Sequence, residues 1–398
     1  MSSLASNPTK VSIGRAMHAV DIDPQHRTAW AQTGLTTGAY TTTHVYGLAT
    51  GFGDTASVGI GGITLGGGIG YLVRKHGLTI DHLLAAELVT ADGHLLHTDD
   101  QTHPDLFWAI RGGGGNFGVA TRFQFRLHPL DTIVGGPLVL PATPEVLAGF
   151  IAAADAAPEE LSAIANVMPA PPLPFLPAEH HGRLVIMATL AYAGDIEAGQ
   201  REVAPLRALA TPLADLVRPM PYPELYPPEQ EGYHPTAVGH NMFMDTLDEQ
   251  VAGTILEHLA VSTAPIRVAQ LRVLGGAMAR VPVEAAAFAH RASRLMLHVA
   301  AVYQDPEEAE VHRGWVDRLA AALHDGGGDA SAYVGFIGDE GQARVHDAYP
   351  GSTWARLVAV KARYDPTNLF HHNQNLPPTK GDPAGEVSAA GNRDPMAG

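Results

Sequence analysis

The chain carries the glycine-rich sequence GLATGFGDTASVGIGGITLGGGIGYLVRKHGL at residues 47–78. Its glycines crowd between Gly61 and Gly70, where they are interleaved with β-branched and other apolar residues. Because glycine has no Cβ, such a run lets the backbone turn sharply or lie close to another surface. The pattern predicts a loop whose N–H groups and bare faces contact a flat or phosphate-bearing ligand. The alternative is a structural glycine-rich turn between strands.

A second glycine cluster, GGGGNFG at residues 112–118, contains the spacing GxGxxG. In a Rossmann nucleotide site this spacing follows a strand and opens a helix. Here residues 103–111 predict a short helix before the cluster, and VATRFQFRL at 119–127 predicts a strand after it. The order of elements is reversed, so the Rossmann interpretation is rejected.

The composition narrows the class of protein. The chain has 398 residues, of which 45% are apolar and 17% charged, and its net charge is −16. Its length indicates two or three structural units, and its acidity argues against nucleic acid or anionic membranes as partners. It contains no cysteine, which excludes disulfides, thiolate metal sites and cysteinyl cofactor bonds. With no membrane-length apolar run and no signal core, a soluble cytoplasmic protein is expected.

The remaining chain alternates between helix-like and strand-like segments. The sequence at 83–100 predicts a hairpin around Asp92-Gly93, and residues 352–363 predict a late helix. Further helices are expected at 144–157, 195–210, 248–260 and 310–324, strands at 183–193, 294–304 and 331–339, and proline-rich loops at 169–177 and 218–230. An α+β fold is expected, with a sheet covered by helices.

Other catalytic motifs are missing from the sequence. It has no HExxH, no GxSxG and no P-loop, and no metal site is predicted. The doublets His180-His181 and His371-His372 are interpreted as solvated loop histidines. Tyr349, just before the late helix, is a candidate general base, although a phenol needs a cationic neighbour or favourable hydrogen bonds to ionise. The alternative is a tyrosine that only packs its ring.

Four motifs in order resemble the FAD-linked oxidases of the berberine bridge enzyme-like group, which have the vanillyl-alcohol oxidase or PCMH-type FAD-binding fold. They are the glycine segment from Asp54 to Leu78, HPDLFWAIRGGGGNFGVATRF at 103–123, GGAMARVPVEAAAFAHR at 275–291 and YDPTNLFHHNQNLPP at 364–378. The resemblance covers residues 11–378. It implies an FAD-binding domain at 1–130, an α+β substrate domain with an antiparallel sheet at 131–342, a returning segment at 343–378 and a disordered tail at 379–398.

The resemblance also implies a site. FAD would be the cofactor, Tyr349 the catalytic base, and Tyr333, on an expected strand, would face the substrate. His290-Arg291 matches a family His-Arg pair without an assigned role, and Val58 matches a position linked to oxygen access, which favours oxidase over dehydrogenase. The implied cofactor-binding residues are Asp54, Thr55, Ser57, Val58, Gly59, Gly61, Gly62, Gly66, Gly67, Gly70, Tyr71, Gly115, Asn116, Phe117, Gly118, Val119, Asn373 and Gln374.

The implied function is an FAD-dependent oxidase that oxidises a hydroxyl- or C–H-bearing small molecule, such as a secondary metabolite or sugar, by hydride transfer to flavin N5. O2 or another acceptor would take the electrons, and homo-oligomerisation is left open. The chain departs from the family because it has no Arg-x-Gly-Gly-His loop, and Asp54 stands where some members have a cysteinyl anchor. The FAD domain is therefore expected to lack its N-terminal part and to bind FAD non-covalently. The alternatives are a mis-assigned start or a truncated non-catalytic relative that acts as a binding or scaffold protein.

Overall fold

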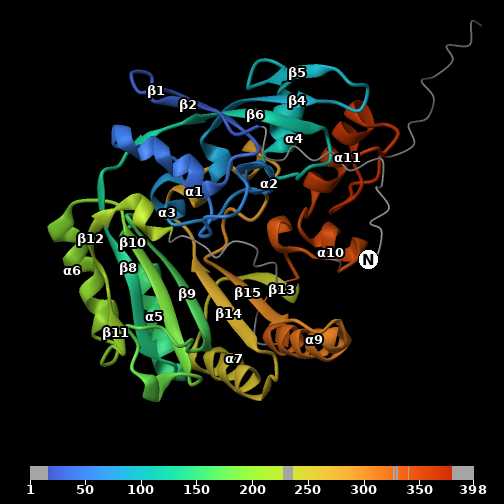
Figure 1. Cartoon of the computed structure of the whole chain (residues 1–398). Helices are drawn as coiled ribbons and strands as arrows, with labels where there is room; N and C mark the ends of the chain where they lie inside the picture. Colours follow the sequence, from blue (N-terminus) through green and yellow to red (C-terminus); the bar gives the residue numbers. More distant parts are fainter. Residues whose placement is uncertain (1–16, 227–235, 326–327, 329, 339, 379–398) are drawn as a thin grey trace, which may run out of the picture.

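The computed structural model describes residues 17–226, 236–325, 328, 330–338 and 340–378. The expected tail at 379–398 lies outside the described residues. Two large antiparallel sheets form the framework (Figure 1). The smaller sheet lies at the top of the view and the larger at the bottom, and the C-terminal helices return to the smaller sheet. This is the α+β architecture that the sequence predicted.

The smaller sheet has the strand order β1-β2-β6-β4-β5. Its strands are β1 Val20–Asp23, β2 Thr28–Gln32, β4 Leu83–Val89, β5 Leu95–Thr98 and β6 Val119–Arg126. β4 and β5 form the predicted hairpin, in which Gly93 has a φ of +82°. The inward side chains Phe123 and Phe125 of β6 are completely buried, and Phe125 meets Phe52 edge to face. The alternating apolar residues of this strand therefore form the centre of one hydrophobic core.

The larger sheet has the order β11-β8-β10-β9-β14-β15-β13, and β12 also pairs with β8. Its strands are β8 Thr132–Pro141, β9 Leu161–Pro169, β10 Leu184–Tyr192, β11 Ala214–Asp215, β12 Arg218–Pro221, β13 Thr236–Met244, β14 Ile266–Val273 and β15 Leu295–Tyr303. A short pair, β3 Leu48–Ala49 with β7 His128–Pro129, lies where the chain passes between the sheets. Every neighbouring pair in the larger sheet is antiparallel.

Helices cover one face of the larger sheet (Figure 1). They are α5 Pro144–Ala156, α6 Ile196–Arg207, α7 Glu249–Val261 and α9 Ala309–Asp325. Strand alternation separates the two faces, because Leu271 of β14 packs under these helices while Gln270 and Arg272 point to the other face. That other face meets the glycine-rich segment, so polar side chains of the larger sheet reach the half of the molecule that contains the smaller sheet.

The remaining helices lie in or beside the glycine-rich segments and in the C-terminal part of the chain. They are α1 Thr37–Tyr40, α2 Ile60–Gly66, α3 Val73–His76, α4 Pro104–Ile110, α8 Ala277–Arg280, α10 Gln342–Asp347 and α11 Ser352–Tyr364. The predicted helices at 103–111 and 352–363 correspond to α4 and α11, which contact each other. Leu357 of α11 is completely buried in the core of the smaller sheet. The C-terminal segment thus packs with the smaller sheet.

Two local predictions were wrong. Residues 331–339 were expected to form a strand, but the described part contains the 3-10 helix η7 Val334–Phe336. The amide of Tyr333 is bound by the side chain of Asn241, at 2.6 Å, instead of by a neighbouring strand. Residues 218–230 were expected to form a loop, but they include β12 and the 3-10 helix η4 Tyr222–Leu225. Residues 227–230 lie outside the described residues.

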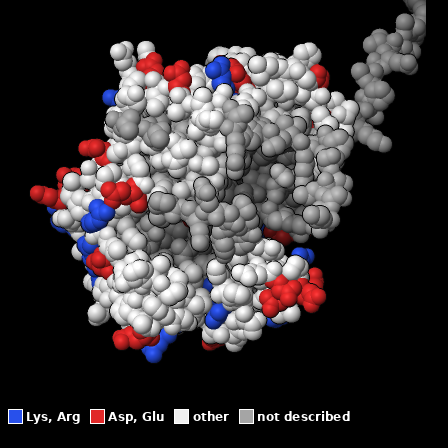
Figure 2. Space-filling view, in the orientation of Figure 1, with Lys and Arg blue, Asp and Glu red and all other residues white. Residues whose placement is uncertain are grey.

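The surface agrees with the acidic composition. On the face shown in Figure 2, acidic side chains gather in the region of α9. Glu307, Glu308 and Glu310, at the start of this helix, are exposed. Lysine and arginine side chains are dispersed among acidic ones elsewhere on this face. In the described part of the chain, no helix is both long and apolar enough to cross a bilayer.

Candidate active site

The first glycine segment is partly helical, which corrects the prediction of a continuous loop. Residues Ile60–Gly66 form α2, and the left-handed backbone of Gly67 and Gly68, with φ of +135° and +79°, ends it. A Cβ on Gly68 would lie 2.0 Å from Thr79 Oγ1. A Cβ on Gly70 would lie 1.9 Å from the carbonyl oxygen of Phe52. These glycines serve close packing within the protein, as the structural interpretation expected.

Other glycines of the same segment face open space. A Cβ on Gly62 would meet no heavy atom of the described residues within 4 Å, and the same holds for Gly115 in the second cluster. Both residues line a cavity. The two interpretations of the glycine-rich sequence therefore apply to different glycines. Some glycines permit close backbone packing, and others leave room for a ligand.

The second cluster folds against the first. The amides of Gly112 and Gly114 both donate to the carbonyl of Leu65 in α2, each at 3.0 Å. Positive φ values of +120° and +72° at these two glycines allow that double contact. The cluster follows α4 and precedes β6, so the order of elements is helix, loop, strand. The rejection of a Rossmann site is confirmed.

The C-terminal NQN loop, which contains Asn373, Gln374 and Asn375, packs against the second glycine cluster. The side-chain amide of Asn116 donates to the carbonyl oxygens of Gly113 and Gln374, each at 3.0 Å, and its Oδ1 accepts from the amide of Leu376 at 3.0 Å. Gln374 Nε2 donates to the carbonyl of Ile337 at 2.6 Å. Asn116 therefore joins the second glycine cluster to the C-terminal loop.

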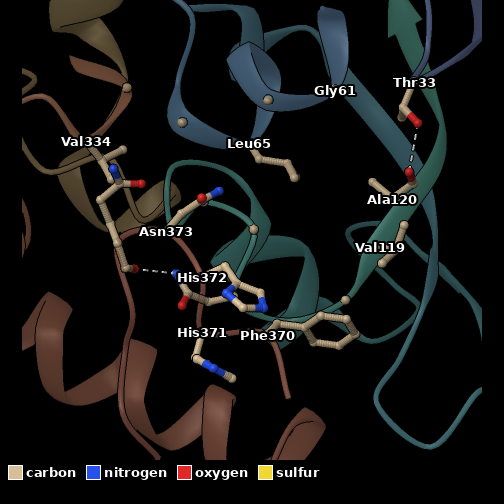
Figure 3. Close-up of a pocket in the computed structure, with 18 of the residues that line it drawn as sticks. Thr33, Gly61, Leu65, Val119, Ala120, Val334, Phe370, His371, His372 and Asn373 are labelled. Carbon is tan, nitrogen blue, oxygen red and sulfur yellow. Dashed lines mark hydrogen bonds between the residues drawn. The ribbon is translucent and has the colours of Figure 1, made fainter. Parts of the chain in front are cut away.

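These three segments enclose a cavity of about 1100 Å³. In Figure 3, Thr33, Val119 and Ala120 lie on one side, Val334 lies on the other, and His372 lies between them. Thr33 Oγ1 donates to the carbonyl of Ala120 at 2.8 Å, as the dashed line marks. The lining residues are Thr33, Gly61, Gly62, Leu65, Gly66, Gly114, Gly115, Asn116, Gly118, Val119, Ala120, Val334, Gly335, Leu369, Phe370, His371, His372, Asn373 and Gln374.

Half of the eighteen predicted cofactor-binding residues line this cavity. They are Gly61, Gly62, Gly66, Gly115, Asn116, Gly118, Val119, Asn373 and Gln374. The other nine do not belong to its lining: Asp54, Thr55, Ser57, Val58, Gly59, Gly67, Gly70, Tyr71 and Phe117. Of these, Phe117 is a core residue with 1% exposure, and Gly59 is the N-cap of α2. Val58 is 38% exposed, and its carbonyl accepts from the amide of Thr37 at 2.8 Å.

Asp54 instead joins the two halves of the molecule. Its Oδ2 accepts from Arg272 at 2.9 Å and from Gln270 Nε2 at 3.2 Å, both on β14. Arg272 is 3% exposed and also donates to the carbonyl of Ile69 at 2.6 Å. Gln270 Nε2 donates to Asn166 Oδ1 at 2.9 Å. An ion pair between buried Arg272 and half-buried Asp54 thus connects the glycine segment to the larger sheet.

Tyr71 lies beside that network. Its hydroxyl donates to the carbonyl of Asp54 at 3.4 Å, and its ring meets the ring of Tyr226 edge to face. Burial, reinforced by the negative charge of Asp54, raises the pKa of Tyr71. Tyr226 in turn donates to the carbonyl of Gly53 at 3.0 Å. The tyrosines are therefore neutral donors that fix the backbone of the glycine segment.

The two predicted catalytic tyrosines lie behind the glycine walls. The Tyr349 hydroxyl donates to the carbonyl of Gly112 at 3.2 Å, and Tyr349 is 1% exposed. The Tyr333 hydroxyl accepts from the amide of Gly68 at 2.9 Å. Burial raises the pKa of both phenols, although the bond from Gly68 opposes the shift at Tyr333. Neither residue belongs to the lining of the cavity.

The His-Arg pair at 290–291 has a structural explanation. Arg291 binds both carboxylate oxygens of Asp81, at 2.7 and 2.8 Å, and its side chain is 3% exposed. His290 stacks on Phe243 with ring centroids 4.5 Å apart, and its Nε2 lies 3.1 Å from the carbonyl oxygen of Ala348. The pair therefore anchors the segment after α8 to Asp81 and to the turn before Tyr349.

Sequence reasoning missed part of the cavity wall. Phe370, His371 and His372 line it; the two histidines are exposed loop residues, as the sequence predicted, but their place in the cavity wall was not anticipated. Their position directly before Asn373 was the available signal, because adjacent residues of one loop share its surroundings. His371 and His372 are the titratable side chains among the described lining residues, which contain no Asp, Glu, Lys or Arg.

The cavity fits the properties of FAD. Gly62 and Gly115 leave the space that a Cβ would otherwise fill, so a flat ring can lie against bare backbone. Among the lining residues that the structure describes, no carboxylate is present to repel a pyrophosphate. Backbone N–H groups of a glycine-rich loop are suitable donors for such an anion. Among the described residues, no group of three or more His, Asp or Glu is placed to hold a metal ion.

Comparison with known proteins gives an independent line of evidence. The family model described as "FAD binding domain" matches residues 2–99. The model described as "Berberine and berberine like" matches residues 332–377, which include the NQN loop. The two matched regions contain both the first glycine segment and the C-terminal wall of the cavity.

Individual relatives agree with these matches. An FAD-linked oxidoreductase of Dictyostelium discoideum is 29% identical over 379 residues, which cover 91% of this chain and 78% of that protein. The (R)-6-hydroxynicotine oxidase of Paenarthrobacter nicotinovorans is 28% identical over 355 residues, covering 84% and 73%. The solved structure of a xylooligosaccharide oxidase from Myceliophthora thermophila, in complex with xylobiose, has a TM-score of 0.76 at 24% identity, covering 91% and 80%.

Proposed function

We propose that this chain, which belongs to the berberine bridge enzyme-like group of FAD-linked oxidoreductases, oxidises a hydroxyl- or C–H-bearing small molecule by hydride transfer. The observation that carries the proposal is the cavity of about 1100 Å³ between both glycine clusters and the NQN loop. Relatives named for 6-hydroxynicotine and for xylooligosaccharides support a hydroxylated secondary metabolite or sugar as the substrate class.

The protein's part in this reaction is binding and orientation. When bound, FAD accepts the hydride and passes the electrons to O2 or another acceptor. Gly62 and Gly115 provide flat contact surface, and Asn373 and Gln374 provide polar contact from the C-terminal loop. The larger sheet presents Gln270 toward the glycine segment, where its amide binds Asp54 and Asn166, and we propose that the substrate binds on this face of the sheet.

We propose non-covalent attachment of the cofactor. The sequence has no cysteine, and Asp54, at the position of the family's cysteinyl anchor, uses its carboxylate to bind Arg272 and Gln270. A carboxylate held in this ion pair is an acceptor for two donors rather than a free nucleophile. Retention of FAD therefore depends on the fit of the cavity.

We also propose that Tyr349 is the catalytic base, which requires that its present hydrogen bond is broken first. Tyr349 donates its proton to the Gly112 carbonyl, a bond that only the neutral phenol makes, and burial raises its pKa. Proton abstraction by Tyr349 therefore requires that this bond is exchanged for one to the substrate. Val58 matches a family position that is linked to oxygen access, and on this basis we propose oxidase rather than dehydrogenase activity.

The experiment loads the purified chain with FAD and mixes it anaerobically with hydroxylated aromatics and with oligosaccharides. Loss of the visible flavin absorption identifies a substrate. With that substrate, Tyr349→Phe is expected to abolish turnover and to retain the flavin, while Tyr303→Phe, a change on the far side of the larger sheet, should leave both intact. Full turnover by Tyr349→Phe would reject the base assignment, and no bleaching with either substrate class would count against the proposed reaction.

A further inference from the structure

Lys361 is a charged side chain that lies completely inside the protein. It belongs to α11, and its side chain and that of Asp365 are both 0% exposed. Lys361 Nζ donates to Asp365 Oδ2 at 2.6 Å, to the carbonyl of Asn116 at 2.8 Å and to the carbonyl of Phe370 at 2.7 Å. An ammonium has three N–H donors, so each of them has one acceptor.

Two of these acceptors belong to two different segments that line the proposed cofactor cavity. Asn116 lies in the second glycine cluster, and Phe370 lies in the C-terminal loop; both line the cavity. A single ammonium thus bridges two backbone segments that are more than 250 residues apart in sequence. The side-chain bond from Asn116 to the Gln374 carbonyl, at 3.0 Å, closes the same two segments from the other side.

Asp365 prolongs this bridge along the C-terminal loop. Its Oδ1 accepts from the amide of Leu369 at 2.8 Å, and its Oδ2 accepts from the amide of Phe370 at 2.8 Å. The carboxylate therefore fixes the start of the loop that carries His371 to Gln374. Because every oxygen and every ammonium proton has a partner, the pair holds one geometry and is costly to disturb.

We propose that Lys361, together with Asp365, is the positioning residue that sets the separation of the glycine cluster and the NQN loop for cofactor binding. This inference rests on the proposed binding of FAD in this cavity. A small displacement of one wall is expected to weaken binding strongly, because a bound group must meet both walls at once. Lys361 touches no cavity space itself and acts through Asn116 and Phe370.

The test compares Lys361→Met with the double variant Lys361→Met/Asp365→Asn. The single change leaves a buried carboxylate without its cation, whereas the double change removes both charges and should recover part of the lost resistance to urea. FAD affinity, measured by quenching of flavin fluorescence, is expected to fall about 10- to 100-fold in both variants. Lys75→Met is the matched control, because Lys75, the other lysine in the described part of the chain, binds the Ala193 carbonyl away from the cavity.

A second readout does not require the cofactor. Amide hydrogen exchange in the apoprotein should become faster in the peptides covering 112–118 and 366–376 in both Lys361 variants, and should stay unchanged there in Lys75→Met. If the double variant regains wild-type FAD affinity together with stability, or if exchange in these two peptides is unchanged, Lys361 is only a stabilising residue and the inference is overturned. Wild-type protein that binds no FAD would instead contradict the proposed function, while the exchange experiment still decides the role of Lys361.

Discussion

Replacing Gly62 with alanine is expected to stabilise the fold and to weaken cofactor binding. Gly62 lies inside α2, and a Cβ there would meet no heavy atom within 4 Å in the part of the chain that the structure describes. Alanine is favoured over glycine in a helix by roughly 0.5–1 kcal/mol, because glycine loses more backbone freedom on folding. Gly62→Ala is therefore expected to raise the free energy of unfolding of the apoprotein by about that amount.

The same methyl group should weaken cofactor binding. Gly62 lines the cavity, so the added carbon occupies space that a ring lying on the backbone would need. We expect FAD affinity to fall about 10-fold, which corresponds to roughly 1.4 kcal/mol. Urea unfolding of the apoprotein measures the first effect, and flavin fluorescence titration measures the second.

Gly70→Ala provides the contrast. A Cβ on Gly70 would lie 1.9 Å from the Phe52 carbonyl oxygen, so this variant should lose about 3 kcal/mol of stability or fail to fold. The reasoning is refuted if Gly62→Ala is more stable and binds FAD as tightly as the wild type. In that case Gly62 does not face the cofactor.

Two further predictions concern stability. The contacting histidines His76, His82 and His128 have lowered pKa values because of burial, about 3 for His76 and about 4 for His128, against an ordinary value of 6.5. The unfolded chain therefore takes up protons that the folded chain does not, and the free energy of unfolding should fall by about 2 kcal/mol or more as the pH falls from about 7 to about 5; a flat urea-unfolding profile over that range would contradict this. Asp54→Asn leaves the buried Arg272 without its counter-charge and should cost about 3 kcal/mol, with part recovered in the double variant Asp54→Asn/Arg272→Met. A urea-unfolding loss below about 1 kcal/mol would show that Gln270 and water replace the pair.

Local sequence patterns predicted those elements whose own residues show a clear periodicity or turn signal. The hairpin of β4 and β5 follows from apolar runs around Asp92-Gly93, and α11 follows from its 3.6-residue repeat. The strands β9, β13 and β14 were not identified from the sequence; in the larger sheet β9 pairs with β10 and β14, and β13 and β14 both pair with β15. The segment around Tyr333 has the aromatic and β-branched composition of a strand, but tertiary contacts with Asn241 and Gly68 decide its conformation.

The site was predictable only in part, for a similar reason. Glycine-rich sequence indicated which segments approach a ligand, but it could not separate Gly62, which faces the cavity, from Gly70, which packs on Phe52. That difference depends on what lies opposite each glycine in the folded chain. Likewise, no local pattern showed that Lys361 reaches both Asn116 and Phe370, because the three residues meet only through the return of the C-terminal helix.

The absorption spectrum of the purified chain after incubation with FAD and removal of the excess tests the central claim most directly. The account predicts that the visible flavin bands stay with the protein and move to the supernatant after acid precipitation, because the sequence has no cysteine and Asp54 is held by Arg272. A protein that retains no flavin would contradict a cofactor site in this cavity. Flavin that remains on the precipitate would contradict non-covalent binding.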